Sequence, residues 1–389
     1  MSEENKALAA SGGRRSLGVL ARAKARFAKL YACPPHLADI HNSANYIPNL
    51  DGLRAVSILI VLCSHFITNM IPGGLGVYVF FVISGFLIAR QFFNEKERAG
   101  AIDRKNFYVR RVFRLYPVAL VYTAVVLVAY ALLGMEIDWW QPASAIFYFS
   151  NYLYADLLLT GDKEGLMPFL IFWSLSVEEH FYLLFPTIFV LLGGNARKLG
   201  IMLLIVIVGA LLLRTGIAWR NPDLIGTRYF YYRSEFRIDS IAYGVAIAVA
   251  GASPAGQALL RRVANPASFI VGLSLMLFCL LYRDPFFRET LRYSLNGIGI
   301  TLCVVSVLFS ARLALVQALL NNRVLVYIGK LSYSLYLWHL LAPIVTEPLF
   351  GEAVTPVSIV VNFALAFAVS SASYHLLEIP FLKLRKKFH

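Results

Sequence analysis

Apolar runs long enough to cross a lipid bilayer recur along most of the chain. A helix needs about 17–25 residues to span ~30 Å of hydrocarbon. Most of the runs reach that length, and the sixth and seventh, which are short, are expected to extend into flanking residues. The pattern predicts an all-α polytopic membrane protein with about ten transmembrane helices, over 53–71, 74–92, 115–134, 169–192, 200–218, 238–252, 267–283, 293–310, 326–346 and 357–377.

A further apolar stretch, 143–158, is short and interrupted by polar residues. It is typical of a re-entrant or interfacial helix rather than of a full crossing. An even number of spans then places both termini on the same side of the membrane.

The distribution of lysine and arginine predicts which side that is, because these residues accumulate in cytoplasmic loops. With the N-terminus inside, the inner segments include 90–114, which holds eight Lys and Arg, and 261–262. The opposite loops 135–168 and 347–356 carry one basic residue between them, Lys163. Both termini are therefore predicted to be cytoplasmic.

The same patterns divide the chain into three parts. We expect a basic cytoplasmic segment over 1–46, a transmembrane domain over 47–382 and a basic cytoplasmic tail over 383–389. The first segment lacks the apolar run and small-residue cleavage site of a signal peptide. Its stretch Arg14–Tyr31 fits either an amphipathic helix on an anionic membrane surface or an unstructured tail.

Composition narrows the class of protein further. The 389 residues are 59% hydrophobic and 15% charged, whereas soluble chains average about 25% charged. These values exclude a disordered chain, a disulfide-stapled scaffold and a fibre. The net charge of +14 resides mostly between apolar runs, so no nucleic-acid partner is expected. The four cysteines lack metal-ligand spacing, and neither a metal site nor a structural disulfide is predicted.

One predicted outer loop, 219–237, breaks the charge rule because it holds four arginines beside three tyrosines. Positive charge kept outside against the bias indicates a binding role, such as holding an anionic sugar or a lipid phosphate. At the outer mouth of the sixth span, Arg237 and Asp239 are predicted to bind a substrate.

Ionisable residues inside a membrane usually serve a function or are paired. His65 lies eleven residues after Arg54 in the first span, about ~16 Å further along a helix axis. A histidine there is a candidate general base. The alternative is a core histidine that bonds to a backbone carbonyl.

The fourth span contains Glu178, Glu179 and His180 in succession. Neighbouring residues on a helix are ~100° apart, so the three cannot face one cavity. We expect one carboxylate to point toward His65 or a substrate and another to have a structural role.

Two basic residues, Arg111 and Arg114, are three positions apart and share a helical face just below the membrane. Such a pair suits a phosphate-bearing cofactor, because arginine offers two parallel donors to phosphate. The alternative is a role in topology and in binding lipid headgroups.

The ninth span carries Ser332, Tyr333, Tyr336 and His339. Ser332, Tyr336 and His339 form a polar stripe at helical spacing, which is typical of a cavity lining or of bonds between helices. The chain contains no nucleotide-binding glycine loop, zinc-protease helix or serine-hydrolase elbow.

Taken together, six runs resemble the acyltransferase-3 family of bacterial membrane acyltransferases, in the family's order and across about residues 47–382. They are NLDGLRAVSILIVLCSHF, GGLGVYVFFVISGFLIAR, RRVFRLYP, WSLSVEEHFYLLFP, FRIDSIAYG and LSYSLYLWHL. The resemblance implies about ten spans, cytoplasmic termini and a place in the bacterial cytoplasmic (inner) membrane. It also implies transfer of an acyl group, usually acetyl, from cytoplasmic acyl-CoA to a hydroxyl of an extracytoplasmic polysaccharide or glycolipid.

By the family's motifs, His65 is the essential histidine, and Arg111 and Arg114 bind CoA. The family's Glu-Glu-Gln-Phe-Tyr stretch reads Glu-Glu-His-Phe-Tyr over 178–182, so any role that depends on an amide at position 180 is lost here. Acetyl-CoA is the expected donor.

The mechanism expected from these matches begins with the CoA phosphates on Arg111 and Arg114, while Arg54 orients the pantetheine arm or thioester. His65 removes a proton from the acceptor hydroxyl as it attacks the thioester, and Glu178 or Glu179 fixes the imidazole. An acyl-histidine intermediate is a variant. The residues expected to bind a substrate are Arg237, Asp239, Tyr333 and His339.

Two other classes stay open at this stage. A transporter or flippase of a glycan or lipid-linked substrate explains the spans and the ionisable residues, though not the six ordered motifs. A membrane scaffold or receptor leaves His65 and the Glu178–His180 triplet unexplained. The acceptor, the acyl chain and the oligomeric state cannot be read from the sequence.

Overall fold

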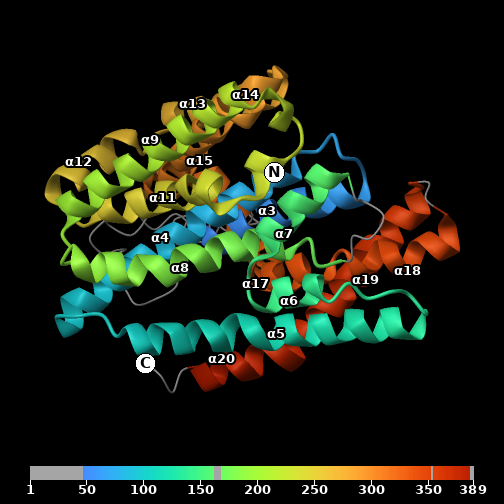
Figure 1. Ribbon diagram of the computed structural model, residues 1–389. Helices are drawn as coiled ribbons and strands as arrows, with labels where there is room; N and C mark the ends of the chain where they lie inside the picture. Colours follow the sequence, from blue (N-terminus) through green and yellow to red (C-terminus); the bar gives the residue numbers. More distant parts are fainter. Residues whose placement is uncertain (1–46, 162–167, 352–353, 386–389) are drawn as a thin grey trace, which may run out of the picture.

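A computed structural model describes residues 47–161, 168–351 and 354–385. In these ranges all regular secondary structure is helical, which confirms the predicted all-α class (Figure 1). The predicted amphipathic stretch Arg14–Tyr31, Lys163 and the end of the basic tail lie outside the described residues. The longer helices are α3 (Leu50–Phe66), α4 (Gly73–Ala99), α5 (Arg104–Leu132), α8 (Phe172–Leu191), α9 (Ala196–Arg220), α11 (Ser234–Gly251), α13 (Pro266–Leu281), α15 (Leu291–Phe309), α17 (Arg323–Trp338) and α19 (Pro356–Ser373).

Shorter helices join and extend these elements. They are α6 (Trp140–Ile146), α7 (Ser150–Thr160), η1 (Pro222–Leu224), α10 (Tyr229–Tyr232), α12 (Pro254–Val263), α14 (Pro285–Glu289), η2 (Ala311–Leu313), α16 (Ala314–Leu320), α18 (Leu341–Phe350), the π-helical turn η3 (Tyr374–Glu378) and α20 (Ile379–Arg385). The apolar stretch predicted not to cross the membrane, 143–158, is divided between α6 and α7.

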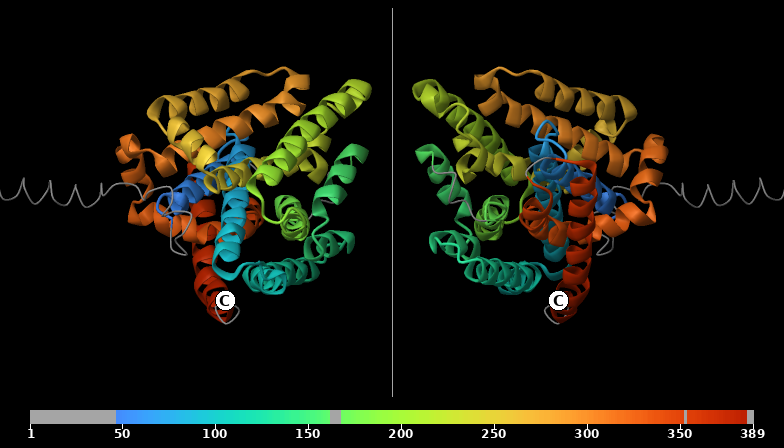
Figure 2. Two further views of the ribbon diagram at one scale, coloured as in Figure 1. Left: turned by 90° about the vertical axis from the view of Figure 1, so that its left-hand side faces the viewer. Right: turned by 90° about the vertical axis from the view of Figure 1, so that its right-hand side faces the viewer.

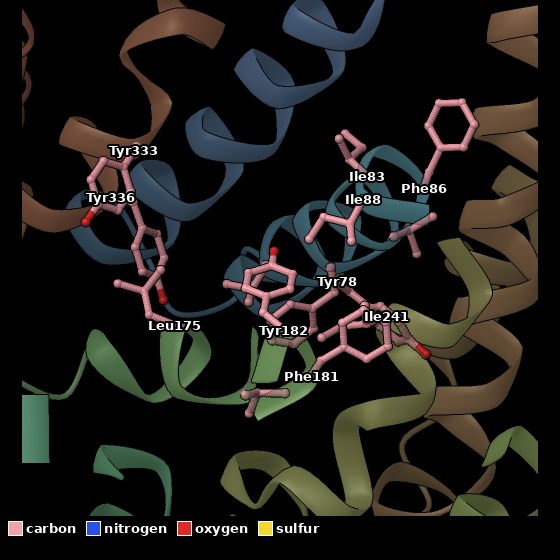
Figure 3. Close-up of a cluster of buried hydrophobic side chains, with 14 of the residues drawn as sticks. Tyr78, Ile83, Phe86, Ile88, Leu175, Phe181, Tyr182, Ile241, Tyr333 and Tyr336 are labelled. Carbon is pink, nitrogen blue, oxygen red and sulfur yellow. The ribbon is translucent and has the colours of Figure 1, made fainter. Parts of the chain in front are cut away.

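Four helices form the centre of the molecule: α4 packs against α11 and α3, and α3 packs against α17. Glycines allow the backbones to approach closely at these crossings. A Cβ on Gly244 of α11 would clash with the Val82 carbonyl of α4, and one on Gly329 of α17 would clash with the Asp51 carbonyl of α3. Small residues at helix contacts are the usual means of close packing in membranes. Figure 3 shows the buried side chains around α4, which include Phe86 and Ile241.

Two groups of helices surround this centre (Figures 1 and 2). On one side, α9 packs on α11, and α13 packs on α15. On the other, the long α5 contacts η3 and α20 near the end of the chain. The helix α8, which carries the ionisable triplet, contacts both α4 and α11 and therefore lies beside the centre.

Every predicted span overlaps a helix, and the ninth overlaps two, but fewer helices meet the length and hydropathy expected of a full crossing. Among the described residues, five do so, and up to seven if each of two bent helix pairs counts as one span. With 17 and 16 residues, α3 and α13 are shorter than a typical crossing. The multi-pass character is thus supported, whereas ten crossings and cytoplasmic termini stay predictions.

The ninth predicted span, 326–346, is not one straight helix. It breaks between α17 and α18, whose axes meet at 64°. Pro343 lies four residues after His339, so it has no amide hydrogen for the His339 carbonyl, and its ring crowds that carbonyl. The break places His339 at the corner between the two helices.

Candidate active site

Two chambers lie side by side in the helical centre. The small chamber, about 90 Å³, is lined by residues that include Arg54, Arg111 and Glu178. The large chamber, about 540 Å³, is lined by residues that include His65. Val77 and Tyr336 line both chambers, so the two spaces meet at these side chains.

His65 lies in the last turn of α3, and its side chain is exposed to the large chamber. Its ring faces that of His339, with 5.0 Å between the ring centroids and 57° between the planes. His339 is buried at the corner of α17 and α18 and lines the same chamber. The predicted base is therefore one of a pair of histidines.

Hydrogen bonding determines the tautomer of His339. Its Nδ1 lies 2.7 Å from the Tyr336 carbonyl oxygen. Because a carbonyl only accepts, Nδ1 carries the proton and Nε2 has a free lone pair. Nε2 is buried and has no hydrogen-bond partner among the described residues. His339 therefore presents a proton acceptor near His65.

The three residues of the ionisable triplet in α8 point in different directions, as their spacing predicted. Glu178 lines the small chamber and accepts a hydrogen bond of 3.0 Å from the Tyr182 hydroxyl. Glu179 is not among the residues that line either chamber. His180 lies 2.6 Å from the Ser234 hydroxyl through its Nδ1.

This arrangement corrects the expectation that Glu178 or Glu179 orients the His65 ring. Glu178 lies in the small chamber, whereas His65 lines the large one and has His339 as its ring neighbour. The prediction that the three residues of α8 point in different directions is confirmed. The partner of His65, however, depends on how α17 packs against α3, which local spacing does not reveal.

Three arginines converge on the small chamber from two helices: Arg54 of α3, and Arg111 and Arg114 of α5. The predicted shared face of Arg111 and Arg114 is confirmed, since both line this space. The guanidinium of Arg111 lies 3.9 Å from the centre of the Tyr182 ring. Within the described chain, no carboxylate forms an ion pair with Arg54 or Arg111. Glu178 is the one carboxylate among the residues that line this chamber, so the three arginines leave its wall with an excess of positive charge.

The predicted polar stripe of α17 runs from one chamber to the other. Ser332 and Tyr333 line the small chamber, Tyr336 lines both, and His339 lines the large one. The Tyr333 hydroxyl donates to the Leu115 carbonyl over 2.7 Å, and the Tyr336 hydroxyl lies 2.7 Å from that of Ser174. Both tyrosines are thus held in place by neighbouring helices.

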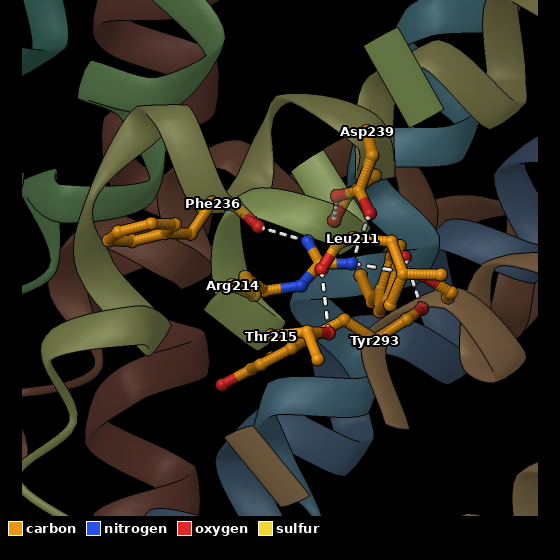
Figure 4. A network of polar contacts seen from close by, with 9 residues as sticks. Leu211, Arg214, Thr215, Phe236, Asp239 and Tyr293 are labelled. Atoms are coloured by element: carbon orange, nitrogen blue, oxygen red, sulfur yellow. Dashed lines mark hydrogen bonds and ion pairs between the residues drawn. The ribbon is translucent and has the colours of Figure 1, made fainter. Parts of the chain in front are cut away.

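Asp239 does not reach the substrate space, contrary to the sequence-based expectation. It is fully buried and forms an ion pair of 2.8 Å with Arg214 (Figure 4). Arg214 also donates to the Ser294 hydroxyl over 2.9 Å and to the Phe236 carbonyl. The Arg214–Asp239 pair therefore joins α9, α11 and α15, whereas Arg237, two residues before Asp239, lines the large chamber.

Sequence comparison identifies the family of this site. The profile of the acyltransferase domain family, acyltransferase-3, matches residues 47–375. The chain belongs to the acyltransferase-3 family.

Curated relatives of this acyltransferase-3 protein carry related names. A Staphylococcus aureus (strain COL) protein named "Putative O-acetyltransferase SACOL0978" is 31% identical over 359 residues, which cover 88% of this chain and 58% of the relative. O-acetyltransferase OatA of S. aureus (strain NCTC 8325 / PS 47) is 30% identical over 360 residues, 89% of this chain and 58% of its own length. The chain thus spans less than two thirds of these relatives. No solved structure matches it.

Three arginines of this acyltransferase-3 protein, Arg214, Arg288 and Arg292, were not predicted to have a role. Arg214 is a lone arginine inside the apolar run 200–218, and this position is the sequence signal of a buried pair. Arg288 and Arg292 of the large chamber carry no motif that would have singled them out.

No group of three or more His, Cys, Asp or Glu side chains that could hold a metal ion occurs among the described residues of this family member.

Proposed function

We propose that the protein is a membrane O-acyltransferase that moves an acyl group, acetyl foremost, from acyl-CoA to a hydroxyl of a glycan or glycolipid. One observation carries the proposal: a chamber lined by three arginines meets a chamber lined by His65 and His339 at Val77 and Tyr336. The family, and relatives named O-acetyltransferases, support the same reaction class.

The small chamber is the site for the donor's thioester end. At about 90 Å³ it is far below the roughly 300–1,000 Å³ of pockets for drug-sized ligands, so the nucleotide would stay outside and only the reactive end of the donor would enter. Arg111 and Arg114, which line this chamber, would hold the CoA phosphates, and Arg54 would orient the arm.

The large chamber then receives the acceptor. In the orientation that the charge distribution favours, both termini are cytoplasmic, the chain makes about ten crossings of the bacterial inner membrane, and the small chamber faces inward. The predicted loop 219–237 lies on the opposite side, and its Arg228 and Arg237 line the large chamber. Donor and acceptor would enter from opposite faces.

The reaction requires one proton transfer and one exchange of bonds. A His65 nitrogen takes the proton of the acceptor hydroxyl while its oxygen attacks the thioester carbonyl. The new C–O bond forms, the C–S bond breaks, and the CoA thiolate leaves and takes up that proton. A small turn of the His65 ring would let its other, protonated nitrogen donate to the free Nε2 of His339, and this bond would hold the ring in its basic tautomer. Attack by His65 itself, followed by transfer to the acceptor, is the two-step variant.

Thiol release from acetyl-CoA by the purified, detergent-solubilised chain tests the proposal. We expect wild type to release CoA thiol, and His65→Ala to lose at least ~100-fold of the rate, the scale of general acid–base catalysis. His375→Ala is the matched control, because His375 is exposed and lines neither chamber. Full activity of a folded His65→Ala variant would contradict the proposal.

The same experiment separates this proposal from a transporter or flippase. Two adjoining chambers could also form part of a transport path, and a transporter would move its substrate without consuming a thioester. Folded wild-type protein that moves a glycan across proteoliposomes but releases no thiol from any acyl-CoA would favour transport.

A further inference from the structure

Arg237 is a buried cation in the wall of the large chamber. It is 1% exposed, and its Nε and Nη2 have no hydrogen-bond partner among the described residues. Its guanidinium lies 4.5 Å from the centre of the Tyr293 ring and 5.0 Å from that of Tyr78. Aromatic faces stabilise a buried cation in part, but they do not satisfy its N–H donors.

Arg214 provides a comparison for Arg237, because it is a buried arginine with a structural role. Arg214 is equally buried and has a carboxylate partner, Asp239, at 2.8 Å. Arg237 lies two residues before Asp239, yet no ion pair within 4.0 Å connects it to a carboxylate of the described residues. An unpaired buried charge is costly, so the missing anion is expected to come from a ligand.

The rest of the chamber wall has the same sign. Arg228, Arg288 and Arg292 line it together with Arg237, whereas Glu289 is its one acidic lining residue. None of these five residues takes part in an ion pair with a described side chain. Low-dielectric walls that carry one sign of charge concentrate ions of the opposite sign.

Other arginines of the predicted outer loop do not contribute to this charge. Arg233 pairs with Glu235 at 2.8 Å and with Asp156 at 3.3 Å. Arg220 is exposed and lines a separate surface pocket. Of the four arginines in the predicted loop 219–237, two line the large chamber, Arg228 and Arg237. Arg288 and Arg292, from the segment around α14, line it as well.

We propose that the large chamber binds an acceptor that carries an oxyanion, a carboxylate or a phosphate, and that Arg237 holds this group beside His65. The inference rests on the proposed function, because it assigns the anion to the acceptor. Arg228, Arg288 and Arg292 attract the anion, and Arg237 supplies the donors that fix its position. Trp173 and Tyr231, which also line the chamber, offer apolar faces to a sugar ring.

Three matched probes test the charge requirement. Methyl glucuronide carries a carboxylate where methyl glucoside has a hydroxymethyl group, and glucose 1-phosphate carries a phosphate. Binding to the full-length purified protein is followed by tryptophan fluorescence, because Trp173 lies in the chamber wall 4.7 Å from Tyr231, ring centre to ring centre. We expect at least one anionic probe to bind roughly 10- to 100-fold more tightly than the glucoside.

Variants test whether the preference for an anionic probe arises in the large chamber. Arg237→Gln should remove it, and Arg288→Gln, at a less buried position, should weaken it without the risk of misfolding that a buried substitution carries. Arg220→Gln removes the same charge from the same segment outside the chamber and should bind as wild type does. Preference for the glucuronide identifies a carboxylate, and preference for glucose 1-phosphate a phosphate.

Equal binding of the glucoside and both anions, binding of no anionic probe, or an anion preference unchanged in both chamber variants would overturn the inference. Thiol release from acetyl-CoA, measured on the same preparations, reports on the proposed function separately. Turnover without anion preference would leave the proposed function standing and remove the inference. Anion preference without turnover would keep the anion site and remove the proposed function.

Discussion

The rings of His65 and His339 lie 5.0 Å apart, centroid to centroid, across the contact between α3 and α17. His339 is fixed by its Nδ1–H bond to the Tyr336 carbonyl, so its Nε2 can only accept a proton. His65 has no such restraint and is exposed to the chamber. The pair thus joins an anchored acceptor to a histidine that can reach a substrate.

Replacing His339 tests whether it positions His65. We expect His339→Ala to lower kcat roughly 5- to 100-fold, the worth of a hydrogen bond of ~1–3 kcal/mol, with little change in the KM for acetyl-CoA. His339→Gln offers an amide oxygen that accepts but does not titrate, and it should recover much of the loss. Equal losses in the two variants would indicate that His339 itself carries a proton in the reaction.

Removal of Arg111 from the small chamber should raise the KM for acetyl-CoA roughly 10- to 100-fold and change kcat less, since charge-assisted bonds to phosphate are lost. Acetyl-pantetheine lacks the nucleotide phosphates, so for Arg111→Ala the difference from wild type should disappear with this donor. Arg261→Ala, on the exposed face of α12, is the control. A KM effect of the same size with both donors would rule out phosphate binding by Arg111.

The ion pair between Arg214 and Asp239 should matter for stability. Asp239→Asn leaves Arg214 as an unpaired charge among α9, α11 and α15, and we expect a loss of ~3–5 kcal/mol. The double variant Arg214→Met/Asp239→Leu removes both charges and should melt closer to wild type than the single variant does. Thermal melting in detergent measures the difference. A double variant that melts no higher than the Asp239→Asn variant would show that the pair does not act as a unit.

Gly244 should tolerate no larger side chain. A Cβ at this position meets the Val82 carbonyl, so Gly244→Ala forces α4 and α11 apart and should cost ~1–3 kcal/mol. Gly209→Ala provides the matched control in α9, because nothing lies within 4 Å of its added Cβ. There alanine should be neutral or stabilising by up to ~1 kcal/mol. Similar melting temperatures for the two variants would disprove the close crossing.

Local sequence patterns were enough to predict the helical class and most helix positions. Apolar run length and helical spacing are local properties, and they correctly placed Arg111 and Arg114 on one face and spread the Glu178–His180 triplet over several directions. The polar stripe of α17 was also predicted to line a cavity or to form bonds between helices. Six motifs in order were enough to recognise the family, because they extend over nearly the whole chain.

Which side chains come into contact follows from the packing of the helices and could not be predicted from local sequence. His339 reaches His65 because Gly329 lets α17 approach α3 closely and the chain bends before Pro343. Asp239 turns to Arg214, while Arg237, two residues earlier, faces the chamber. Helical periodicity specifies the face on which a residue lies, but the partner on the neighbouring helix follows from crossing angles and close backbone contacts. Those contacts are made between segments far apart in the chain, where local spacing carries no information.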